Sequence, residues 1–167
     1  MKRLILMRHA KSSWSDPEQK DIDRPLNKRG LRDAPAMGKW LAGRGYLPDQ
    51  ALVSSAKRTQ ETWRGVISEI PDCPAEFQPQ LYQAGPAAMM TALQGTPAAA
   101  ESLVMIGHQP GIGDFARRLL AIPPNDGDFD RYPTTATAII DFEADAWSAI
   151  AWNSGTLKDF IIPRNLT

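Results

Sequence analysis

Two short aliphatic runs that lead into histidines constrain the fold of this chain more than any other feature of its sequence. Residues 4–7 directly precede Arg8 and His9, and residues 103–106 lie just before His108. The 167 residues contain no other histidine. Such runs are typical of strands buried on both faces of a parallel sheet, and ligands of open α/β folds bind outside the carboxyl ends of those strands. The pattern therefore predicts a parallel sheet with both imidazoles at one site.

Strand and helix signals alternate along the chain, which predicts βαβ units in an α/β, three-layer sandwich. We expect a mostly parallel central sheet with helices on both faces. The link at residues 143–146 has the length of a hairpin connection, so the last two strands should form a late antiparallel pair. The predicted strands are residues 3–8, 50–54, 76–78, 103–106, 137–142 and 147–153, and the predicted helices are residues 27–41, 56–69, 86–94 and 112–121.

Prolines affect two of the predicted segments, the first helix and the stretch before the fifth strand. Asn27 is a suitable N-cap for the first helix, but Pro35 within it removes a backbone donor. A kink or a late start near Asp33 is therefore expected. The proline-rich residues 122–133 predict a loop between elements, ordered or mobile.

Length and composition fit one enzyme domain spanning residues 1–167. Nineteen basic residues balance nineteen acidic ones, so a charge-driven partnership with nucleic acid or an anionic membrane is not expected. The lone Cys73 cannot form an internal disulfide, which fits a reducing compartment. The chain has neither a signal-peptide pattern nor a long apolar segment, so we expect a cytoplasmic protein. Composition leaves the oligomeric state open.

Two arginines near the predicted strand ends suit phosphate recognition. Arg8 precedes His9, and Arg58 follows the strand that ends at Ser54. A guanidinium offers phosphate oxygens a planar fork of N–H groups, which an ammonium cannot do. Taken alone, Arg58 is better explained as an exposed helix residue, and its offset from the strand end is what favours a role in the site. Because a neutral imidazole can attack phosphorus, the set indicates phosphoryl transfer.

Three segments at these strand ends resemble the histidine phosphatase superfamily, also called phosphoglycerate-mutase-like or RHG proteins. They are Arg8-His9-Ala10, residues 53–62 and residues 107–111, in the family's order. The chain is most similar to the SixA-type phosphohistidine phosphatases, on the basis of residues 7–14, 23–26, 81–84 and 157–166.

The resemblance implies a role for each of the main residues. His9 would be the nucleophile that carries the phosphoryl group, and His108 would stabilise the phosphoryl oxygens together with Arg8 and Arg58. It implies neither a cofactor nor a metal. A second set could line the mouth of the phosphate site or be solvated loop residues: Lys11, Ser12, Ser13, Arg24 and, beside His108, Gln109. Trp14 could shape the entrance.

The chain departs from the wider family where relatives carry a general acid. Those positions hold Gln83 and Gln109, and a glutamine cannot deliver a proton. General acid help is worth about two to four powers of ten, so cleavage of poor alkoxide leaving groups is disfavoured. A phosphorylated imidazole leaves well once its other nitrogen is protonated, which favours a phosphoramidate substrate. Several carboxylates could still swing in as the acid: Asp16, Glu18, Asp21, Asp23 and Glu76.

Three functions remain open from the sequence. The first is removal of phosphate from phosphohistidine in a protein partner. The second is hydrolysis of small phosphomonoesters. The third is a weakly catalytic module that binds phosphate, although binding alone needs no nucleophile such as His9. A mutase is less favoured because the chain lacks both the acid and the insertions that enclose a sugar phosphate.

Overall fold

The computed structural model describes residues 1–166 and contains a six-stranded mixed sheet in the order β3-β2-β4-β1-β5-β6. Thr167, the last residue of the predicted domain, lies outside the described residues. The first four strands of that order run parallel, β5 runs antiparallel to β1, and β6 antiparallel to β5. The predicted α/β sheet with a late antiparallel pair is confirmed. The strands are β1 Lys2–Arg8, β2 Gln50–Ser54, β3 Ala75–Gln78, β4 Ser102–Gly107, β5 Thr137–Phe142 and β6 Thr156–Ile161.

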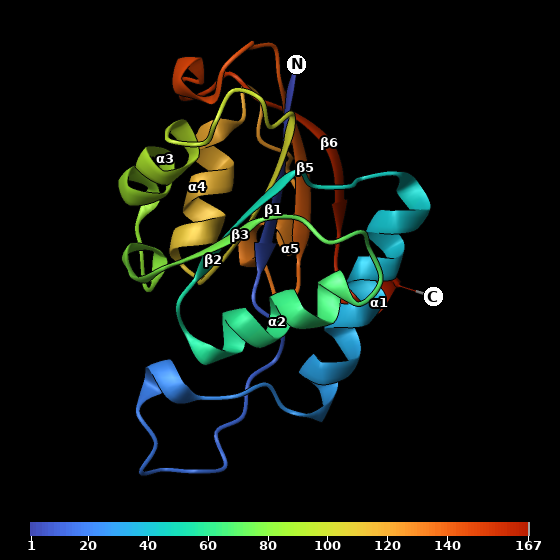
Figure 1. Ribbon diagram of the computed structural model, residues 1–167, viewed down its shortest axis with the longest axis vertical. Coiled ribbons are helices and arrows are strands. Elements are labelled where there is room, and N and C mark those ends of the chain that lie inside the picture. The colour runs from blue at the N-terminus through green and yellow to red at the C-terminus, as the bar shows by residue number, and fades with distance from the viewer. Residues whose placement is uncertain (167) are drawn as a thin grey trace.

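Helices cover both faces of the sheet, as Figure 1 shows with α3 and α4 on one side and α1 on the other. The alternation of side chains along β1 builds the two cores. Leu4 and Leu6 pack with the helices α3 and α4, whereas Ile5 and Met7 pack with α1 and α2. The helices are α1 Lys28–Arg44, α2 Lys57–Ile67, α3 Pro86–Gln94, α4 Gly111–Leu119 and the short α5 Gly127–Arg131.

The predicted strand at residues 147–153 is wrong. Trp147–Ala149 forms a 3-10 turn, and the last strand is Thr156–Ile161. The indole of Trp147 is fully buried, and its Nε1 donates to the carbonyl of Ala100 at 2.7 Å. This bond fixes the tryptophan at the amino end of β4, so the alternating apolar residues here serve as an anchor and do not pair with the sheet.

The first helix begins earlier than the late start expected near Asp33. The side chain of Asn27 accepts a hydrogen bond from the Gly30 nitrogen at 2.9 Å, and α1 runs from Lys28 through Pro35. The helix ends at Gly45, which has the left-handed φ of 74° that favours glycine. The cap satisfies the first turn, and the proline removes only one bond of a long helix. A kink at Pro35 stays a prediction.

The segment 122–133 is not a loop throughout, because α5 lies within it. The side chain of Asp126 accepts from the Asp128 nitrogen at 2.9 Å and caps the helix. Phe129 is buried against Tyr132 and Phe160. A cap and one aromatic anchor therefore order a stretch whose prolines suggested irregular structure.

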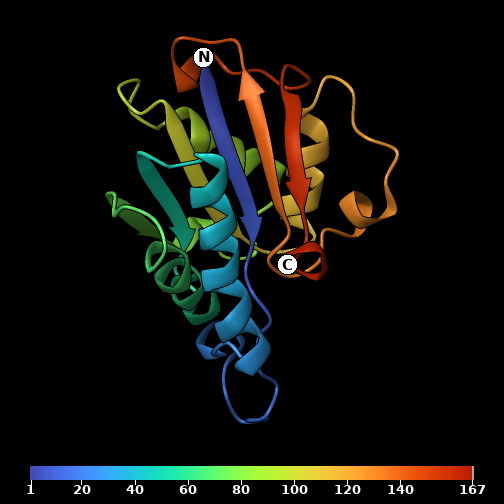
Figure 2. The same ribbon diagram turned by 90° about the vertical axis from the view of Figure 1, so that its right-hand side faces the viewer.

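The parallel strands end at one edge of the sheet, and the long loop after β1 extends beyond that edge. In Figure 2 the dark blue arrow of β1 points toward this loop, which returns to α1. The loop contains the 3-10 turn η1, Asp21–Asp23, and Ser12 forms an isolated bridge with Leu26. Within residues 1–166, no helix has the length and apolar character needed to cross a bilayer.

Candidate active site

The register of the parallel strands brings both histidines to one point. Arg8 of β1 pairs with Gly107 of β4, so the next residues, His9 and His108, leave the sheet side by side. Their ring centroids lie 5.3 Å apart. They are only 6% and 4% exposed. The predicted convergence of the two imidazoles is therefore confirmed.

The ring of His9 is held in one tautomer by its own neighbour. Its Nδ1 lies 2.7 Å from the carbonyl oxygen of Ala10. Because a carbonyl only accepts, Nδ1 carries the proton and donates, and Nε2 keeps its lone pair. The backbone partner that a nucleophilic histidine needs is thus present.

Both histidines are strongly biased toward the neutral form. Burial lowers the pKa of His9 to about 3, against a smaller opposing effect from the Ala10 carbonyl. Burial also lowers the pKa of His108 to about 4, with Arg58 as the next cause. Neither ring is therefore charged near pH 7, and the lone pair of His9 is available for attack.

His108 uses the opposite ring nitrogen for its support. Its Nε2 lies 2.7 Å from the hydroxyl oxygen of Ser54, the last residue of β2. Its Nδ1 is buried, and no partner for it occurs in the part of the chain that the structure describes. When Ser54 donates to Nε2, Nδ1 carries the proton and can serve as a donor inside the site.

The two arginines are anchored in the same way. Nη1 of Arg8 donates to the carbonyl of Tyr132 at 3.2 Å, and Nη1 of Arg58 donates to the carbonyl of Asp21 at 2.7 Å. In both, the buried Nε–H has no partner within residues 1–166. Each guanidinium thus keeps a buried donor edge that can serve an oxyanion.

A polar rim surrounds Arg58. Nη2 of Arg58 lies 3.0 Å from Oδ2 of Asp21, and the Tyr82 hydroxyl donates to the same oxygen at 2.5 Å. Nη1 of Arg24 donates to Oδ1 of Asp21 at 2.8 Å. The Tyr82 hydrogen bond, followed by those from Arg24 and Arg58, holds the pKa of Asp21 well below its usual range. The ring of Tyr82 also stands edge-on to His108, with centroids 5.4 Å apart.

The residues predicted for the mouth of the site do not all reach it. Ser12 and Arg24 bind each other, since Nη2 of Arg24 donates to the Ser12 hydroxyl, and Nε donates to the Ser13 carbonyl at 3.0 Å. The Arg24 guanidinium stacks on Trp14, 3.3 Å from the ring centroid, and Trp14 is 74% exposed. These side chains shape the loop at the mouth, and Arg24 touches the rim only through Asp21.

Lys11 is half-buried, and within residues 1–166 its ammonium makes no hydrogen bond; its carbonyl accepts from the Asn27 nitrogen at 3.0 Å. The Lys11 carbonyl packs against the first turn of α1. A Cβ at Gly30 would come within 2.1 Å of it, so glycine permits the close approach. The segment after His9 is thereby fixed against α1.

The two glutamines at the positions where a general acid was expected, Gln83 and Gln109, line one hollow. The side chain of Gln109 accepts from the Gly113 nitrogen at 2.6 Å and donates to the Arg131 carbonyl at 2.9 Å, so it ties α4 to α5. Gln83 is exposed. This hollow has a volume of 310 Å³, and Asp114 is also part of its wall.

Sequence reasoning assigned no role to Ser54, Tyr82 or Thr135. Ser54 ends a strand as the histidine-bearing runs do, so the same strand-end rule could have found it. The Thr135 nitrogen donates to the His9 carbonyl at 3.0 Å, and its φ of 65° is unusual for a β-branched residue. No local pattern signals that contact, because β5 lies far from β1 in sequence.

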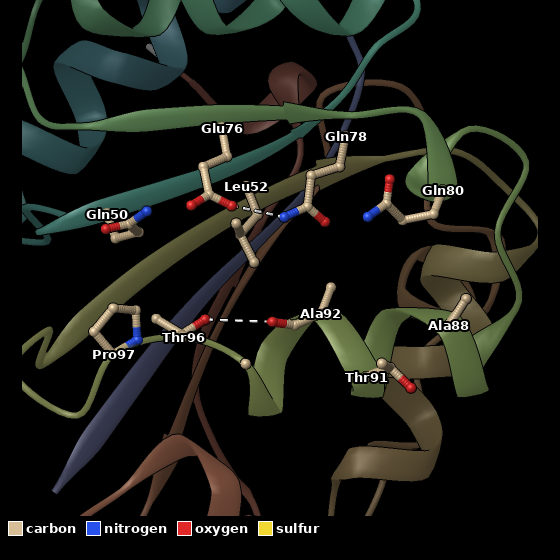
Figure 3. Close-up of a pocket in the computed structure, with 11 residues that line it drawn as sticks. Gln50, Leu52, Glu76, Gln78, Gln80, Ala88, Thr91, Ala92, Thr96 and Pro97 are labelled. Carbon is tan, nitrogen blue, oxygen red and sulfur yellow. Dashed lines mark hydrogen bonds between the residues drawn. The ribbon is translucent and has the colours of Figure 1, made fainter.

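A second pocket lies away from the histidines. Figure 3 shows it between the edge strand β3 and the helix α3, with the Gln78 amide donating to the Glu76 carboxylate at 2.8 Å. Its volume is 240 Å³, and none of the described residues that line it is a histidine, arginine or lysine. Within residues 1–166, no three His, Cys, Asp or Glu side chains are grouped so that they could hold a metal ion.

Comparisons with known proteins agree with this arrangement. The family model of the histidine phosphatase superfamily (branch 1) matches residues 4–84. An uncharacterised protein of Mycobacterium tuberculosis is 30% identical over 165 residues, which cover 95% of this chain and 100% of the relative.

Solved structures are similar over nearly the whole chain. A protein described as a candidate phosphohistidine phosphatase SixA from Nakamurella multipartitia is 26% identical, with a TM-score of 0.83 over 97% of this chain and 96% of its own. The protein histidine phosphatase SixA in complex with tungstate has a TM-score of 0.82 at 23% identity, over 99% of each chain.

Fold and site together define a phosphatase built on a mixed α/β sheet. The chain belongs to the histidine phosphatase superfamily, and within it to the SixA type.

Proposed function

We propose that the chain removes the phosphoryl group from phosphohistidine in a protein partner, through a covalent phosphohistidine at His9. The observation that carries this proposal is the state of the His9 ring. The Ala10 carbonyl holds the proton on Nδ1, and the ring lies beside His108. The buried Nδ1 of His108 and the buried Nε atoms of Arg8 and Arg58 have no partner within residues 1–166. A free imidazole lone pair surrounded by fixed donors suits attack on phosphorus.

The reaction then takes two steps. Nε2 of His9 attacks phosphorus, the phosphorus–nitrogen bond of the substrate breaks, and the departing imidazole takes a proton from solvent. Water next attacks the phosphorus, the bond to His9 breaks, and inorganic phosphate leaves. Arg8, Arg58 and His108 stabilise the phosphoryl oxygens in both steps. No cofactor takes part in either step.

Two groups near the phosphate site, Gln109 and Asp21, are poor proton donors, which supports a phosphoramidate substrate. Gln109 is bound to α4 and α5, and glutamine carries no transferable proton. The carboxylate of Asp21 is held ionised by Tyr82, Arg24 and Arg58, so it is a poor proton donor near pH 7. A leaving imidazole needs less acid help than an alkoxide, because its second nitrogen takes up a proton.

The descriptions of the similar structures, as well as their fold, support phosphohistidine as the substrate class. Two of the similar structures are described as phosphohistidine or protein histidine phosphatases, and one was solved with tungstate, an oxyanion of phosphate-like shape. The loop after β1 carries Trp14, which is 74% exposed. A protein-borne phosphohistidine could approach along this loop.

The test is a comparison of leaving groups in the unmodified protein. Phosphohistidine protein and aryl phosphates should turn over about two to four powers of ten faster than serine or sugar phosphates, the range that a general acid is usually worth. Brief incubation with labelled phosphohistidine protein and a base quench should place an acid-labile, base-stable label on the peptide that contains His9. The label should be absent from His9→Ala. Equal rates on alkyl phosphates, or labelling elsewhere, would contradict the proposal.

A second candidate function is hydrolysis of small phosphomonoesters, favoured by a hollow whose wall includes Gln109, the residue after His108. Gln83 and Asp114 also line this hollow of 310 Å³, which could take an alkyl leaving group. If Asp114 supplies the proton, Asp114→Asn should slow an alkyl phosphate by about a hundredfold and leave an aryl phosphate almost unchanged. An equal effect on both substrates would exclude this role.

A further inference from the structure

Within residues 1–166, one carboxylate contacts a candidate catalytic arginine. This carboxylate is that of Asp21, in the loop after β1. Asp21 meets Arg58 at two points, through its carbonyl at 2.7 Å from Nη1 and through Oδ2 at 3.0 Å from Nη2. The side chain of Arg58 is 6% exposed and that of Asp21 is 38% exposed. Asp21 therefore lies on the outer, solvent side of the guanidinium.

The two contacts select one edge of the guanidinium. A guanidinium has an end edge formed by Nη1 and Nη2, and a side edge formed by Nε and Nη2, and either can bind an oxyanion by two parallel bonds. Asp21 occupies the end edge. The Nε–H of the side edge is buried and has no partner among the described residues. The side edge consequently points inward.

The carboxylate is itself fixed from two directions. The Tyr82 hydroxyl donates to Oδ2 at 2.5 Å, and Nη1 of Arg24 donates to Oδ1 at 2.8 Å. Arg24 is held in turn by Ser12, by the Ser13 carbonyl and by its stacking on Trp14. Asp21 thus cannot rotate away from Arg58 without breaking bonds to residues of other segments.

We propose that Asp21 is a positioning residue for Arg58, which clamps the outer edge of the guanidinium so that its Nε edge is presented to the phosphoryl group. This inference rests on the phosphate-binding role proposed for Arg58. Asp21 does not touch the substrate and acts only through the arginine. The hydrogen bonds from Tyr82, Arg24 and Arg58 keep the pKa of Asp21 below its ordinary value, so the clamp stays charged at neutral pH.

Asp21→Asn tests the clamp, with Asp23→Asn as the matched control. Asp23 belongs to the same 3-10 turn, is exposed, and its carboxylate makes no hydrogen bond or ion pair within residues 1–166. Hydrogen bonds to charged groups are worth enough for about a tenfold to hundredfold effect. Asp21→Asn should weaken tungstate binding and lower kcat/KM for an aryl phosphate by about that factor, whereas Asp23→Asn should leave both within about twofold.

A double-mutant cycle separates positioning from a purely structural role. In an Arg58→Ala background the effect of Asp21→Asn should fall to about twofold or less, because the clamp has nothing left to hold. An equal effect in both backgrounds would show that Asp21 only stabilises the loop, and the inference would be overturned. If the activity of Arg58→Ala is too low to measure, NMR relaxation of the arginine side-chain nitrogens provides the second measurement. The Nε–H of Arg58 should become more mobile in Asp21→Asn and not in Asp23→Asn; unchanged mobility overturns the inference.

Failure of this inference can be distinguished from failure of the proposed function. If the unmodified protein neither binds tungstate nor hydrolyses any phosphorylated substrate, the proposed function is wrong. If the unmodified protein does both and Asp21→Asn behaves like Asp23→Asn, only the role of Asp21 is wrong.

Discussion

The two histidines occupy equivalent places at the ends of adjacent strands, yet they are supported in opposite ways. His9 gives its Nδ1 proton to the Ala10 carbonyl and leaves Nε2 free, whereas His108 pairs Nε2 with the Ser54 hydroxyl and leaves Nδ1 free. A carbonyl can only accept, but a hydroxyl can donate or accept. The first ring is therefore locked in one tautomer, and the second can present a proton or a lone pair.

This difference suits two roles within one site. A nucleophile needs a lone pair that is never protonated at working pH, which the locked tautomer and the pKa of about 3 provide for His9. An oxyanion-binding group needs a donor, which Nδ1 of His108 supplies when Ser54 donates to Nε2. The following predictions test whether the two rings really differ in this way.

The largest effect is expected for His9→Ala. Loss of a covalent nucleophile should reduce kcat by about four powers of ten or more. Tungstate should still bind within about tenfold of the unmodified protein, because Arg8, Arg58 and His108 remain to hold the anion. Steady-state kinetics and calorimetry measure the two quantities. Parallel losses of turnover and affinity would mean that His9 is not a distinct nucleophile.

His108→Ala should have a smaller effect of a different kind. Removal of one donor to the phosphoryl oxygens should lower kcat by about two to three powers of ten. Tungstate affinity should fall as well, and the labelled phosphohistidine at His9 should still form slowly. Rapid-quench labelling of this variant is the measurement, and a label that forms as fast as in the unmodified protein would contradict a role for His108 in stabilising the phosphoryl oxygens.

Acid stability should distinguish the rings from unperturbed histidines. The unfolded chain binds a proton on each histidine near pH 6.5, but the folded chain resists protonation until about pH 3 for His9 and about pH 4 for His108. Stability is therefore lost as the pH falls below about 6.5, at up to about 1.4 kcal/mol per pH unit for each ring. The free energy of unfolding, measured in urea, should fall between pH 7 and pH 5 in the unmodified protein. In His9→Gln this fall should be smaller by about 2 kcal/mol. Equal losses in the two proteins would argue against a buried neutral ring.

The smallest effect is expected for Ser54→Ala. Loss of one hydrogen bond to His108 should lower kcat by about fivefold, since such a bond is worth about 1 kcal/mol. Ser55→Ala is the control, because the Ser55 side chain makes no hydrogen bond within residues 1–166. A pH profile should also change for Ser54→Ala and not for the control, because only Ser54 influences where the His108 proton resides.

Much of the fold follows from local sequence pattern, because aliphatic runs and turn signals act over a few residues. β2, β5 and α3 agree with the predicted bounds, β1 begins one residue earlier, and β4 is one residue longer at each end. The errors arise where a distant contact decides the structure. The segment around Trp147 has the alternation of a strand, but its indole binds a carbonyl near the start of β4, and this long-range bond overrides the pattern.

The same distinction applies to the candidate site. His9 and His108 could be predicted because the strand-end rule places them, and Arg58 because of its offset from a strand end. Asp21 was recognised only as one of several possible acids, whereas in the structure it is an ionised partner of Arg58. Its role depends on Tyr82 and Arg24 converging from separate segments, which no spacing along the chain encodes.

The supports of the Arg8 and His9 pair have a genetic consequence. Both come from main-chain carbonyls, those of Tyr132 and Ala10, which every amino acid possesses. A substitution at either position does not remove the accepting oxygen itself, but both side chains are fully buried, so only a small change at Ala10 leaves that oxygen in place. The hydroxyl of Ser54, by contrast, can be lost by a single substitution. In a mutagenesis screen, Ala10→Gly should keep the hydrogen bond to His9, whereas Ser54→Ala removes the hydrogen bond to His108 outright.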